Sequence, residues 1–293
     1  GTQNTLTDGA TYTLEDDSDE PYATLFSRAD LTLNGTGALT VTSAYRHAVC
    51  SKDDLVITGG TYVVNAVEDA LRGRDCVKIA DGDFTLIAGG DGIKSNKDTK
   101  ATKGFVSIDG GTFVIEAGDD GIQAQTYLRI AGGDISIAAV DDALHSNGEL
   151  LIEGGSLTLS SGDDAVHSDN LLQITGGSIA IDKCYEGVES AKVEISGGTI
   201  EIESYEDGIN AADGTQNRVG VSNDNCHIII SGGYISVNCI GSEGDGVDSN
   251  GTILISGREL YIAGSGNSAD AALDADGGIL INGGYVFAAG SLG

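Results

Sequence analysis

The chain has 293 residues, of which 45 are glycine and only one is proline, so a proline-rich linker or stalk is excluded. It carries 45 acidic and 15 basic residues, a formal net charge of −30, which argues against nucleic acid as a partner and favours divalent cations. No run of 18 apolar residues is present, so no membrane span is predicted.

Turns recur at regular intervals along the chain. Residues 1–30 are expected to form an N-terminal β cap region, and residues 31–293 contain the repeats. Ten aligned glycine-rich turns, from Gly59-Gly60 to Gly283-Gly284, give four spacings of 22 residues, one of 21 and four larger ones. The unit from Leu128 to Gly148 contains three short apolar runs separated by turns. This repeat predicts an all-β protein, a right-handed single-stranded parallel β-helix of about ten coils of roughly 22 residues.

Equivalent residues of successive coils should form columns, because coils stack about 4.8 Å apart. One predicted core column contains Tyr62, Phe84, Phe113, Ile135, Leu157, Ile179, Ile200, Ile235, Leu260 and Val286. A second contains Val49, Leu71, Ile93, Ile122, Leu144, Val166, Val188, Ile209, Val247 and Leu273. Two residues after the second column, small residues such as Ser51, Ser95 and Ser146 are also expected to point inward.

A column of acids stands two residues before the second core column. Its members are Asp69, Asp91, Asp120, Asp142, Asp164, Glu186, Asp207 and Asp245. Several coils carry another acid just ahead of it, namely Glu68, Asp119, Asp141, Asp163, Glu206 and Asp270. Aspartate before glycine or alanine also stabilises a turn by hydrogen bonding to the backbone, which explains the position but not the doubling.

The acid column predicts a calcium site. Like charges about 4.8 Å apart repel by roughly 3 kcal/mol at an effective dielectric near 20, which protonation, hydration or bound cations would relieve. Flexible oxygen cages suit Ca²⁺. The predicted ligands are Asp91, Asp119, Asp120, Asp141, Asp142, Asp163, Asp164, Glu186, Asp207 and Asp245. The coils from Asp119 to Asp164 are the strongest candidates, because no insertion separates them.

An outward ribbon beside the acid column is predicted to contact sugar. It is basic in the early coils and acidic in the late ones, and seven of the 15 basic residues lie between positions 72 and 103. These cations either balance local acids or bind a polyanionic sugar. The predicted sugar contacts are Arg72, Arg74, Lys94, His145, His167, Tyr185 and Tyr205. His145 and His167 could instead form a hydrogen-bonded ladder or a metal pair.

The cysteines and the first residues bear on the compartment. None of the five cysteines shows Cys-x-x-Cys spacing, so zinc and thioredoxin-type chemistry find no support, while disulfides are permitted but not required. The chain starts at Gly1 and contains no methionine or basic-then-apolar leader, which is the pattern of a trimmed mature fragment. We expect an extracellular or cell-surface protein, either a monomer or part of a larger secreted chain.

Four repeated elements, at residues 118–122, 141–146, 162–168 and 244–249, carry a family resemblance. Their sequences GDDGI, DDALHS, GDDAVHS and GDGVDS resemble the secreted bacterial β-helix proteins called carbohydrate-binding domain-containing proteins. The resemblance covers roughly residues 30–293 and implies calcium, with cellulosic or acidic plant polysaccharides as ligands. His47 and Ala271 depart from the pattern, which puts metal binding at the end coils in doubt.

Three functions compete at this point. The first is a calcium-dependent carbohydrate-binding protein for plant cell-wall polysaccharides, including pectic sugars, with no catalytic residue. The second is a surface scaffold or adhesin that calcium makes rigid. The third is an enzyme similar to calcium-dependent pectate lyases, in which Lys94 would remove a proton, with Arg72 or Arg74 as the second choice. We rank binding first, the scaffold second and the lyase third.

Overall fold

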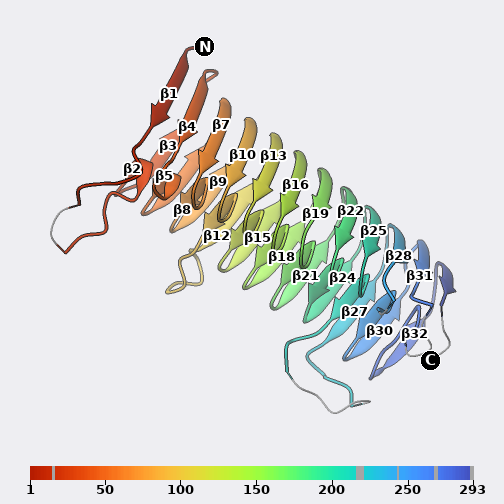
Figure 1. Cartoon of the computed structure of the whole chain (residues 1–293). Coiled ribbons are helices and arrows are strands. Elements are labelled where there is room, and N and C mark those ends of the chain that lie inside the picture. The colour runs from red at the N-terminus through yellow and green to blue at the C-terminus, as the bar shows by residue number, and fades with distance from the viewer. Residues whose placement is uncertain (15–16, 216–220, 243, 267–269, 291–293) are drawn as a thin grey trace. The chain divides into compact units, whose positions relative to one another are not determined.

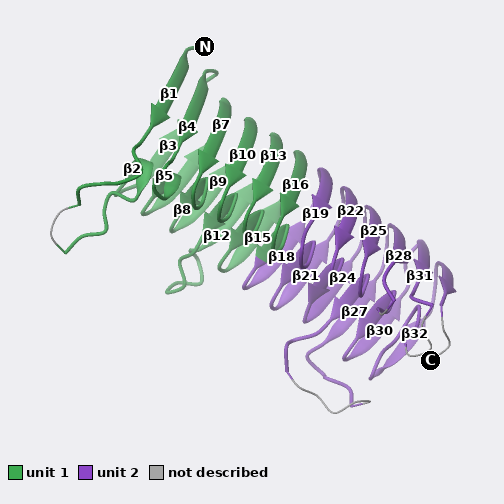
Figure 2. Ribbon diagram, in the orientation of Figure 1, with its two compact units in different colours: residues 1–145 green, residues 146–293 purple. Residues whose placement is uncertain are grey.

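The computed structural model describes residues 1–14, 17–215, 221–242, 244–266 and 270–290 (Figure 1). Over these residues the regular structure consists of parallel strands, with no helix, and the predicted parallel β-helix is confirmed. The chain divides into two compact units, residues 1–145 (unit 1) and 146–293 (unit 2), which are described separately (Figure 2).

Unit 1 contains three parallel sheets, and each coil contributes one strand to each of them. Sheet A consists of β1 (Gln3–Thr7), β4 (Ala38–Thr42), β7 (Thr61–Ala66), β10 (Asp83–Ala88), β13 (Thr112–Ala117) and β16 (Asp134–Ala139). Sheet B consists of β2 (Ala23–Ser27), β5 (His47–Ser51), β8 (Leu71–Gly73), β11 (Ile93–Ser95) and β14 (Ile122–Ala124). Sheet C consists of β3 (Leu31–Leu33), β6 (Asp54–Ile57), β9 (Cys76–Ile79), β12 (Phe105–Ile108) and β15 (Tyr127–Ile130). Strand β17 (Leu144–Ser146) includes the boundary between the units.

Unit 2 repeats this arrangement. Its sheet A consists of β19 (Ser156–Ser160), β22 (Ser178–Cys184), β25 (Thr199–Ser204), β28 (Tyr234–Cys239), β31 (Glu259–Ala263) and β33 (Tyr285–Ala289). Its sheet B consists of β20 (Val166–Ser168), β23 (Val188–Ser190), β26 (Ile209–Ala211) and β29 (Val247–Ser249). Its sheet C consists of β18 (Glu149–Ile152), β21 (Leu171–Ile174), β24 (Lys192–Ile195), β27 (His227–Ile230), β30 (Thr252–Ile255) and β32 (Gly278–Ile281).

The number of coils is slightly larger than the sequence indicates. Among the described residues the sheet A strands number twelve, where about ten coils were predicted. The two additional strands are β1 and β4, which lie before the first aligned turn, Gly59-Gly60. Strand β1 pairs in parallel with β4, and β2 pairs with β5, so strands within the first 30 residues belong to the same sheets as the later coils.

The core of unit 1 is an in-register stack of apolar side chains. Tyr62, Phe84, Phe113 and Ile135 are aligned along sheet A, as predicted. The Tyr62 and Phe84 ring centroids lie 5.0 Å apart at 8°, and those of Phe84 and Phe113 lie 4.6 Å apart at 4°. Burial and ring contact both stabilise this column, because each coil covers the apolar face of its neighbour.

Replacing Phe113 with leucine should lower the free energy of unfolding by about 1–2 kcal/mol. Phe113 is 1% exposed, so the smaller side chain loses the contact with the Phe84 ring and leaves part of its volume unfilled. Urea denaturation at constant pH checks this value. An unchanged midpoint would show that neither the ring contact nor the volume of Phe113 stabilises the fold.

The glycine turns are needed where coils approach closely. Gly111 has φ of +107°, a region that side chains with a Cβ rarely adopt. A Cβ atom at this position would lie 2.7 Å from the carbonyl oxygen of Gly82 in the preceding coil. Glycine therefore fixes the corner between sheets C and A, and the register of the coils depends on it.

The inward column of small residues is also observed. Ser51 and Ser95 are fully buried in unit 1, as is Ser168 in unit 2. All five cysteines are buried free thiols. Among the described residues no helix is long and apolar enough to cross a membrane.

Candidate functional site

The acid column of unit 1 is tied to the backbone of the coil that follows. The backbone N–H of Asp91 donates to Oδ1 of Asp69 at 3.2 Å, that of Asp120 to Asp91 at 3.1 Å, and that of Asp142 to Asp120 at 3.2 Å. All four side chains are at most 5% exposed. Each carboxylate therefore satisfies a buried donor of the next coil, which gives this column a structural role.

The second carboxylate oxygen of each column acid in unit 1 faces a cationic side chain, which for Asp69, Asp91 and Asp142 lies three residues further along the chain. Arg72 Nη1 lies 2.8 Å from Oδ2 of Asp69, and Lys94 Nζ donates to Oδ2 of Asp91. His145 Nδ1 lies 2.9 Å from Oδ2 of Asp142 and 3.3 Å from Oδ2 of Asp120. Side chains of the protein thus supply the positive charge that the sequence analysis assigned to a metal in these coils.

His47 begins the column in place of an acid. Its Nδ1 accepts the backbone N–H of Asp69 at 3.1 Å, the same hydrogen bond that the carboxylates accept in later coils. Burial lowers the pKa of His47, against the opposing charge of Asp69, and keeps the ring neutral so that Nδ1 can accept. A neutral imidazole is therefore a sufficient replacement for aspartate at this position.

The protonation of Lys94 bears on the lyase hypothesis. Burial by itself lowers the pKa of Lys94, but the charge and hydrogen bond of Asp91 outweigh it and raise the pKa above its ordinary value. A general base must be unprotonated near neutral pH. Lys94 is held as an ammonium ion, which suits binding of an anion and disfavours proton abstraction.

The histidines were predicted to contact sugar, and the structure places both beside carboxylates. Burial opposes protonation of His145, but hydrogen bonds with Asp120 and Asp142 raise its pKa to about 10. In unit 2, His167 Nδ1 lies 2.8 Å from Oδ2 of Asp164, and its Nε2 lies 3.5 Å from Asp169. His145 therefore bridges two acids of the column, whereas His167 bridges an acid of the column and Asp169 beside it, as in a hydrogen-bonded ladder.

Cations become rarer along the column of unit 2. Asn210 Nδ2 donates to Oε2 of Glu186 at 3.0 Å, and the backbone N–H of Asp245 donates to Oδ1 of Asp207 at 2.6 Å. Among the described residues, no lysine or arginine forms an ion pair with Glu186, Asp207 or Asp245. The charge balance of unit 2 therefore differs from that of unit 1.

Three acids of unit 2 hold their protons more strongly than usual. Burial, together with the charges of Glu189 and Asp164, raises the pKa of Glu186 to about 9. Burial and the charge of Asp245 raise the pKa of Asp207 to about 7. Burial and the charge of Asp207 raise that of Asp248 to about 7. A buried group of acids without a cation either takes up protons or binds a metal ion.

Three of the additional acids of the doubled pairs are exposed. Asp119 and Asp141 lie on the surface of unit 1, and Asp163 lies on that of unit 2. In unit 1, oxygens of Asp91, Asp119 and Asp120 lie within 4.8 Å of one another. Two of these three side chains already accept protein hydrogen bonds, so a metal ion there would compete with Lys94 and a backbone N–H.

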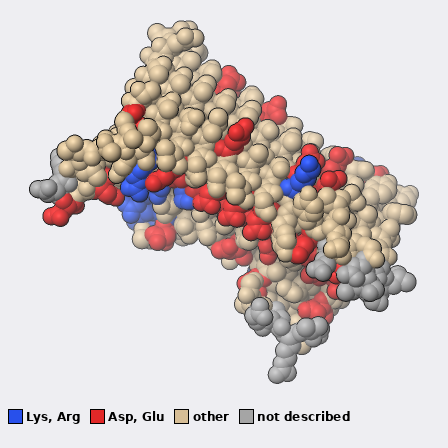
Figure 3. All heavy atoms as spheres, in the orientation of Figure 1, with Lys and Arg blue, Asp and Glu red and all other residues tan. Residues whose placement is uncertain are grey.

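Basic residues of unit 1 gather on sheet B and beside it. This basic patch contains Arg72 and Lys94 on strands β8 and β11, Arg74 just after β8, and the lysines of the 97–103 loop. Arg72 and Lys94 are in register on neighbouring strands. Figure 3 shows Lys and Arg side chains gathered in unit 1 beside acidic ones. Lys103 pairs with Asp75 at 2.8 Å, whereas Arg74 is exposed and forms no ion pair with a described residue.

Three other residues that were predicted to point outward or to flank the acid column differ in exposure. Cys50, which alternation places outward, is 1% exposed, and its thiol forms a hydrogen bond with Tyr22. Tyr185 and Tyr205, predicted sugar contacts in unit 2, are 44% and 50% exposed. The Tyr185 hydroxyl donates to Glu206 at 2.6 Å, which fixes this ring on the surface.

Unit 2 also contains a pocket that the sequence analysis did not identify. Its volume is about 430 Å³, and its lining includes His167, Asp169, Glu189, Asp213 and Asn225. Asp213 anchors the wall, because Oδ1 accepts Thr215 Oγ1 at 2.6 Å and Oδ2 accepts Asn225 Nδ2 at 3.1 Å. The insertion at about 212–225 could not be positioned from sequence, and its residues 216–220 lie outside the described residues.

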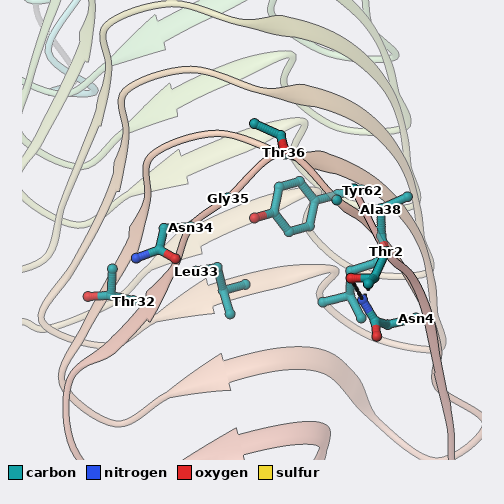
Figure 4. Close-up of a pocket in the computed structure, with 13 residues that line it drawn as sticks. Thr2, Asn4, Thr32, Leu33, Asn34, Gly35, Thr36, Ala38 and Tyr62 are labelled. Carbon is teal, nitrogen blue, oxygen red and sulfur yellow. Dashed lines mark hydrogen bonds between the residues drawn. The ribbon is translucent and has the colours of Figure 1, made fainter.

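A polar pocket of about 480 Å³ lies among the first coils of unit 1. Figure 4 shows Thr2, Asn4, Thr32 and Asn34 around it, with Tyr62 as the aromatic ring. Its lining contains hydroxyls, amides and glycine but no carboxylate, lysine or arginine side chain. The repeat pattern marks only Gly60 and Tyr62 among these residues, because the others lie before the first aligned turn.

Comparison with known proteins decides the family. A model of the carbohydrate-binding domain-containing protein family matches residues 1–187, well over half of the chain. The chain belongs to this family. A carbohydrate-binding domain-containing protein of Acetivibrio thermocellus is 43% identical over 61 residues, which is 20% of this chain and 21% of the relative. This chain therefore matches about a fifth of that relative's length.

A further similarity was found among solved structures. The structure found is described as the polysaccharide lyase-like protein from C. thermocellum, in a gadolinium derivative. It is 16% identical to this member of the carbohydrate-binding domain-containing family, with a TM-score of 0.39 and 90% of each chain covered.

Proposed function

We propose that this chain is an extracellular, calcium-dependent carbohydrate-binding protein whose ligands are plant cell-wall polysaccharides, including acidic pectic ones. Membership of the carbohydrate-binding domain-containing family supports a polysaccharide as the partner. The basic patch on sheet B carries the proposal for an acidic sugar, because it is a cluster of cations on a chain with a net charge of −30. Such a patch attracts an anionic polymer locally, where the rest of the surface repels it.

The protonated state of Lys94 favours binding over lyase chemistry. Arg72 and Lys94 are each held by a column acid, so their positions are fixed before a ligand arrives. Arg74, which has no such partner, is free to form a two-point hydrogen bond with a uronate carboxylate. Calcium would connect further carboxylates of the polymer to acids of the protein, since oxygen ligands from both suit it.

Replacing Arg74 with alanine should weaken binding of polygalacturonate about tenfold, or ~1.4 kcal/mol. The cause is loss of a charge-assisted hydrogen bond at an exposed position, which should leave folding unchanged. Isothermal titration calorimetry in the presence of calcium checks this. Arg129→Ala is the matched control, because Arg129 lies on sheet C and pairs with Asp109 at 2.7 Å.

Equal losses of affinity for polygalacturonate in Arg74→Ala and Arg129→Ala would indicate that only the net charge of the protein affects binding. Absence of binding to polygalacturonate and to neutral cell-wall glycans, with and without calcium, would overturn the proposed function and leave the scaffold hypothesis. Thermal melts run beside the titrations separate the two, because a scaffold shows a calcium shift without a polysaccharide shift.

A further inference from the structure

The outer side of sheet A becomes aromatic on the neighbouring strands β28, β31 and β33 of unit 2. Alternation places Tyr234, Tyr261 and Tyr285 on this side, because residues next to them along the strands, such as Ile235 and Leu260, are buried. In the preceding coils of unit 2 the residues in register with Tyr234 are small and polar, namely Ser156, Ser178 and Thr199. The solenoid therefore forms without an aromatic ring at this position, and the tyrosines call for another explanation.

The tyrosine face, which consists of Tyr234, Tyr261 and Tyr285, extends over three strands. Its rings are 37%, 41% and 79% exposed. Tyr234 and Tyr285 are both in register with Glu259, one on each side of it, and the ring centroids of Tyr234 and Tyr261 lie 5.6 Å apart. None of the three hydroxyls forms a hydrogen bond with a described residue, whereas the hydroxyl of Tyr185 donates to Glu206. Both the rings and the hydroxyls of this face are thus open to a ligand.

A polar pocket adjoins the tyrosine face at the corner between sheets C and A. Its volume is about 530 Å³, which is within the range of ligand sites. Its lining includes Ser196, Ser231, Tyr234, Arg258 and Glu259, together with the paired glycines before β25 and β28. Hydroxyls, one ring, one cation and one acid suit a ligand that carries many hydroxyl groups.

Arg258 occupies a turn position that glycine holds in the adjacent coils. Gly233 and Gly284 are its counterparts, with φ of +90° and +82°, and each precedes the residue in register with Glu259. Arg258 is exposed, and neither it nor Glu259 forms an ion pair with a described residue. The turn does not require this arginine and no acid holds it, so its guanidinium can donate to a ligand.

The charge around the tyrosine face disfavours an acidic polymer. Glu259 lies between two of the tyrosines, and Glu201 and Glu203 lie on the adjacent strand β25, where the pocket lining adds one cation, Arg258. Acids outnumber cations here, so a polyanion would be repelled. An uncharged sugar ring instead packs its apolar face on an aromatic ring, while its hydroxyls accept from a guanidinium and donate to a carboxylate.

We propose that this surface of unit 2 is a second polysaccharide site, which binds an uncharged glycan by stacking its sugar rings on the tyrosine face. Arg258 and Glu259 form hydrogen bonds with the hydroxyls of the glycan in the pocket. The inference rests on the proposed function for the class of ligand, but it assigns neutral and acidic polymers to different places. Because the basic patch lies in unit 1, one chain can hold both polymers at once and connect them.

The test is calorimetric titration of the whole chain, in the presence of calcium, with cellohexaose, xylohexaose and mannohexaose. The wild type should bind at least one of these neutral oligosaccharides saturably. The double variant Tyr234→Ala, Tyr261→Ala should bind it at least about tenfold more weakly, because two ring contacts are lost. Arg258→Gly restores the residue of the adjacent turns, and it should bind the oligosaccharide about fivefold more weakly without a fall in melting temperature.

Two control variants separate ring stacking from general effects. Tyr234→Phe combined with Tyr261→Phe keeps both rings and should retain the wild-type affinity within about threefold. Val114→Ala truncates an exposed side chain on the outer side of sheet A in unit 1 and should have no effect. Saturating polygalacturonate should also leave the affinity for the oligosaccharide unchanged, because the two ligands occupy different sites.

The inference is overturned if polygalacturonate binds but no neutral oligosaccharide does, if polygalacturonate displaces the oligosaccharide, or if the folded double alanine variant binds it as tightly as the wild type. A dimer in sedimentation that only this variant loses would also overturn it, since a second copy would then cover the tyrosine face. Should the double alanine variant not fold, Arg258→Gly decides. Oligosaccharide binding at the tyrosine face without polygalacturonate binding would sustain this inference while overturning the acidic ligand of the proposed function.

Discussion

Replacing Asp91 with alanine is expected to lower the free energy of unfolding by about 3–5 kcal/mol. Asp91 is fully buried and its two oxygens perform different tasks. Oδ1 accepts the backbone N–H of Asp120, and Oδ2 accepts the ammonium of Lys94. Alanine would leave a buried donor without an acceptor and a largely buried cation without a counter-charge.

Urea denaturation of the variant and of two further variants checks the cause. Asp91→Asn keeps an acceptor for the N–H of Asp120 but not the charge, so it should fall between alanine and the wild type. Asp91→Ala combined with Lys94→Met should recover part of the loss, because no unpaired charge remains. A loss below about 1 kcal/mol for Asp91→Ala would contradict the structural role assigned to the column.

Metal-free protein should lose at least about 2 kcal/mol of stability between pH 5 and pH 8. Burial raises the pKa of Asp207 and of Asp248 to about 7 and that of Glu186 to about 9. The unfolded chain releases these protons near pH 4, so the folded chain binds more protons above that pH. Stability therefore falls as pH rises from about 4 to 7, and further towards 9 through Glu186.

Denaturation in chelator at several pH values measures this slope. The triple variant Glu186→Gln, Asp207→Asn, Asp248→Asn removes three of the acids whose pKa is raised and should show a clearly smaller slope over the same range. Excess calcium should also reduce the fall, because a cation can take the place of the protons. A wild-type stability that rises steadily from pH 5 to pH 8 would show that these acids are not protonated in the folded state.

The fold could be predicted because each coil of a solenoid repeats the same pattern of apolar runs and turns in the sequence. Phe84 and Phe113 lie 29 positions apart, yet the glycine turns aligned them correctly despite the insertion between them. The alignment did not include strands β1 and β4, because neither is preceded by a Gly-Gly turn of the repeat. The spacing of the glycine turns therefore predicts which residues share a column. This prediction fails where a coil lacks the common turn.

The candidate site was predictable only in part. The sequence places Asp91 and Lys94 three positions apart, but it does not show that Lys94 neutralises Asp91 and leaves no vacancy for a metal there. Oδ1 of Asn210 is buried and has no hydrogen-bond donor among the described residues. This depends on the orientation of the amide group, which residue spacing does not determine. The pocket beside His167 required the path of a long insertion, and such paths depend on contacts such as those of Asp213.

The directed hydrogen bonds of the acid column make each coil a self-contained module. Asp69 and Asp91 lie 22 residues apart, and the carboxylate of each requires from the next coil only a backbone N–H in register with it. Removing or duplicating one such module would therefore present the same acceptor to the same kind of donor. Gene duplication could therefore lengthen such a protein, and engineering could shorten it, while the hydrogen bonds between neighbouring coils stay the same.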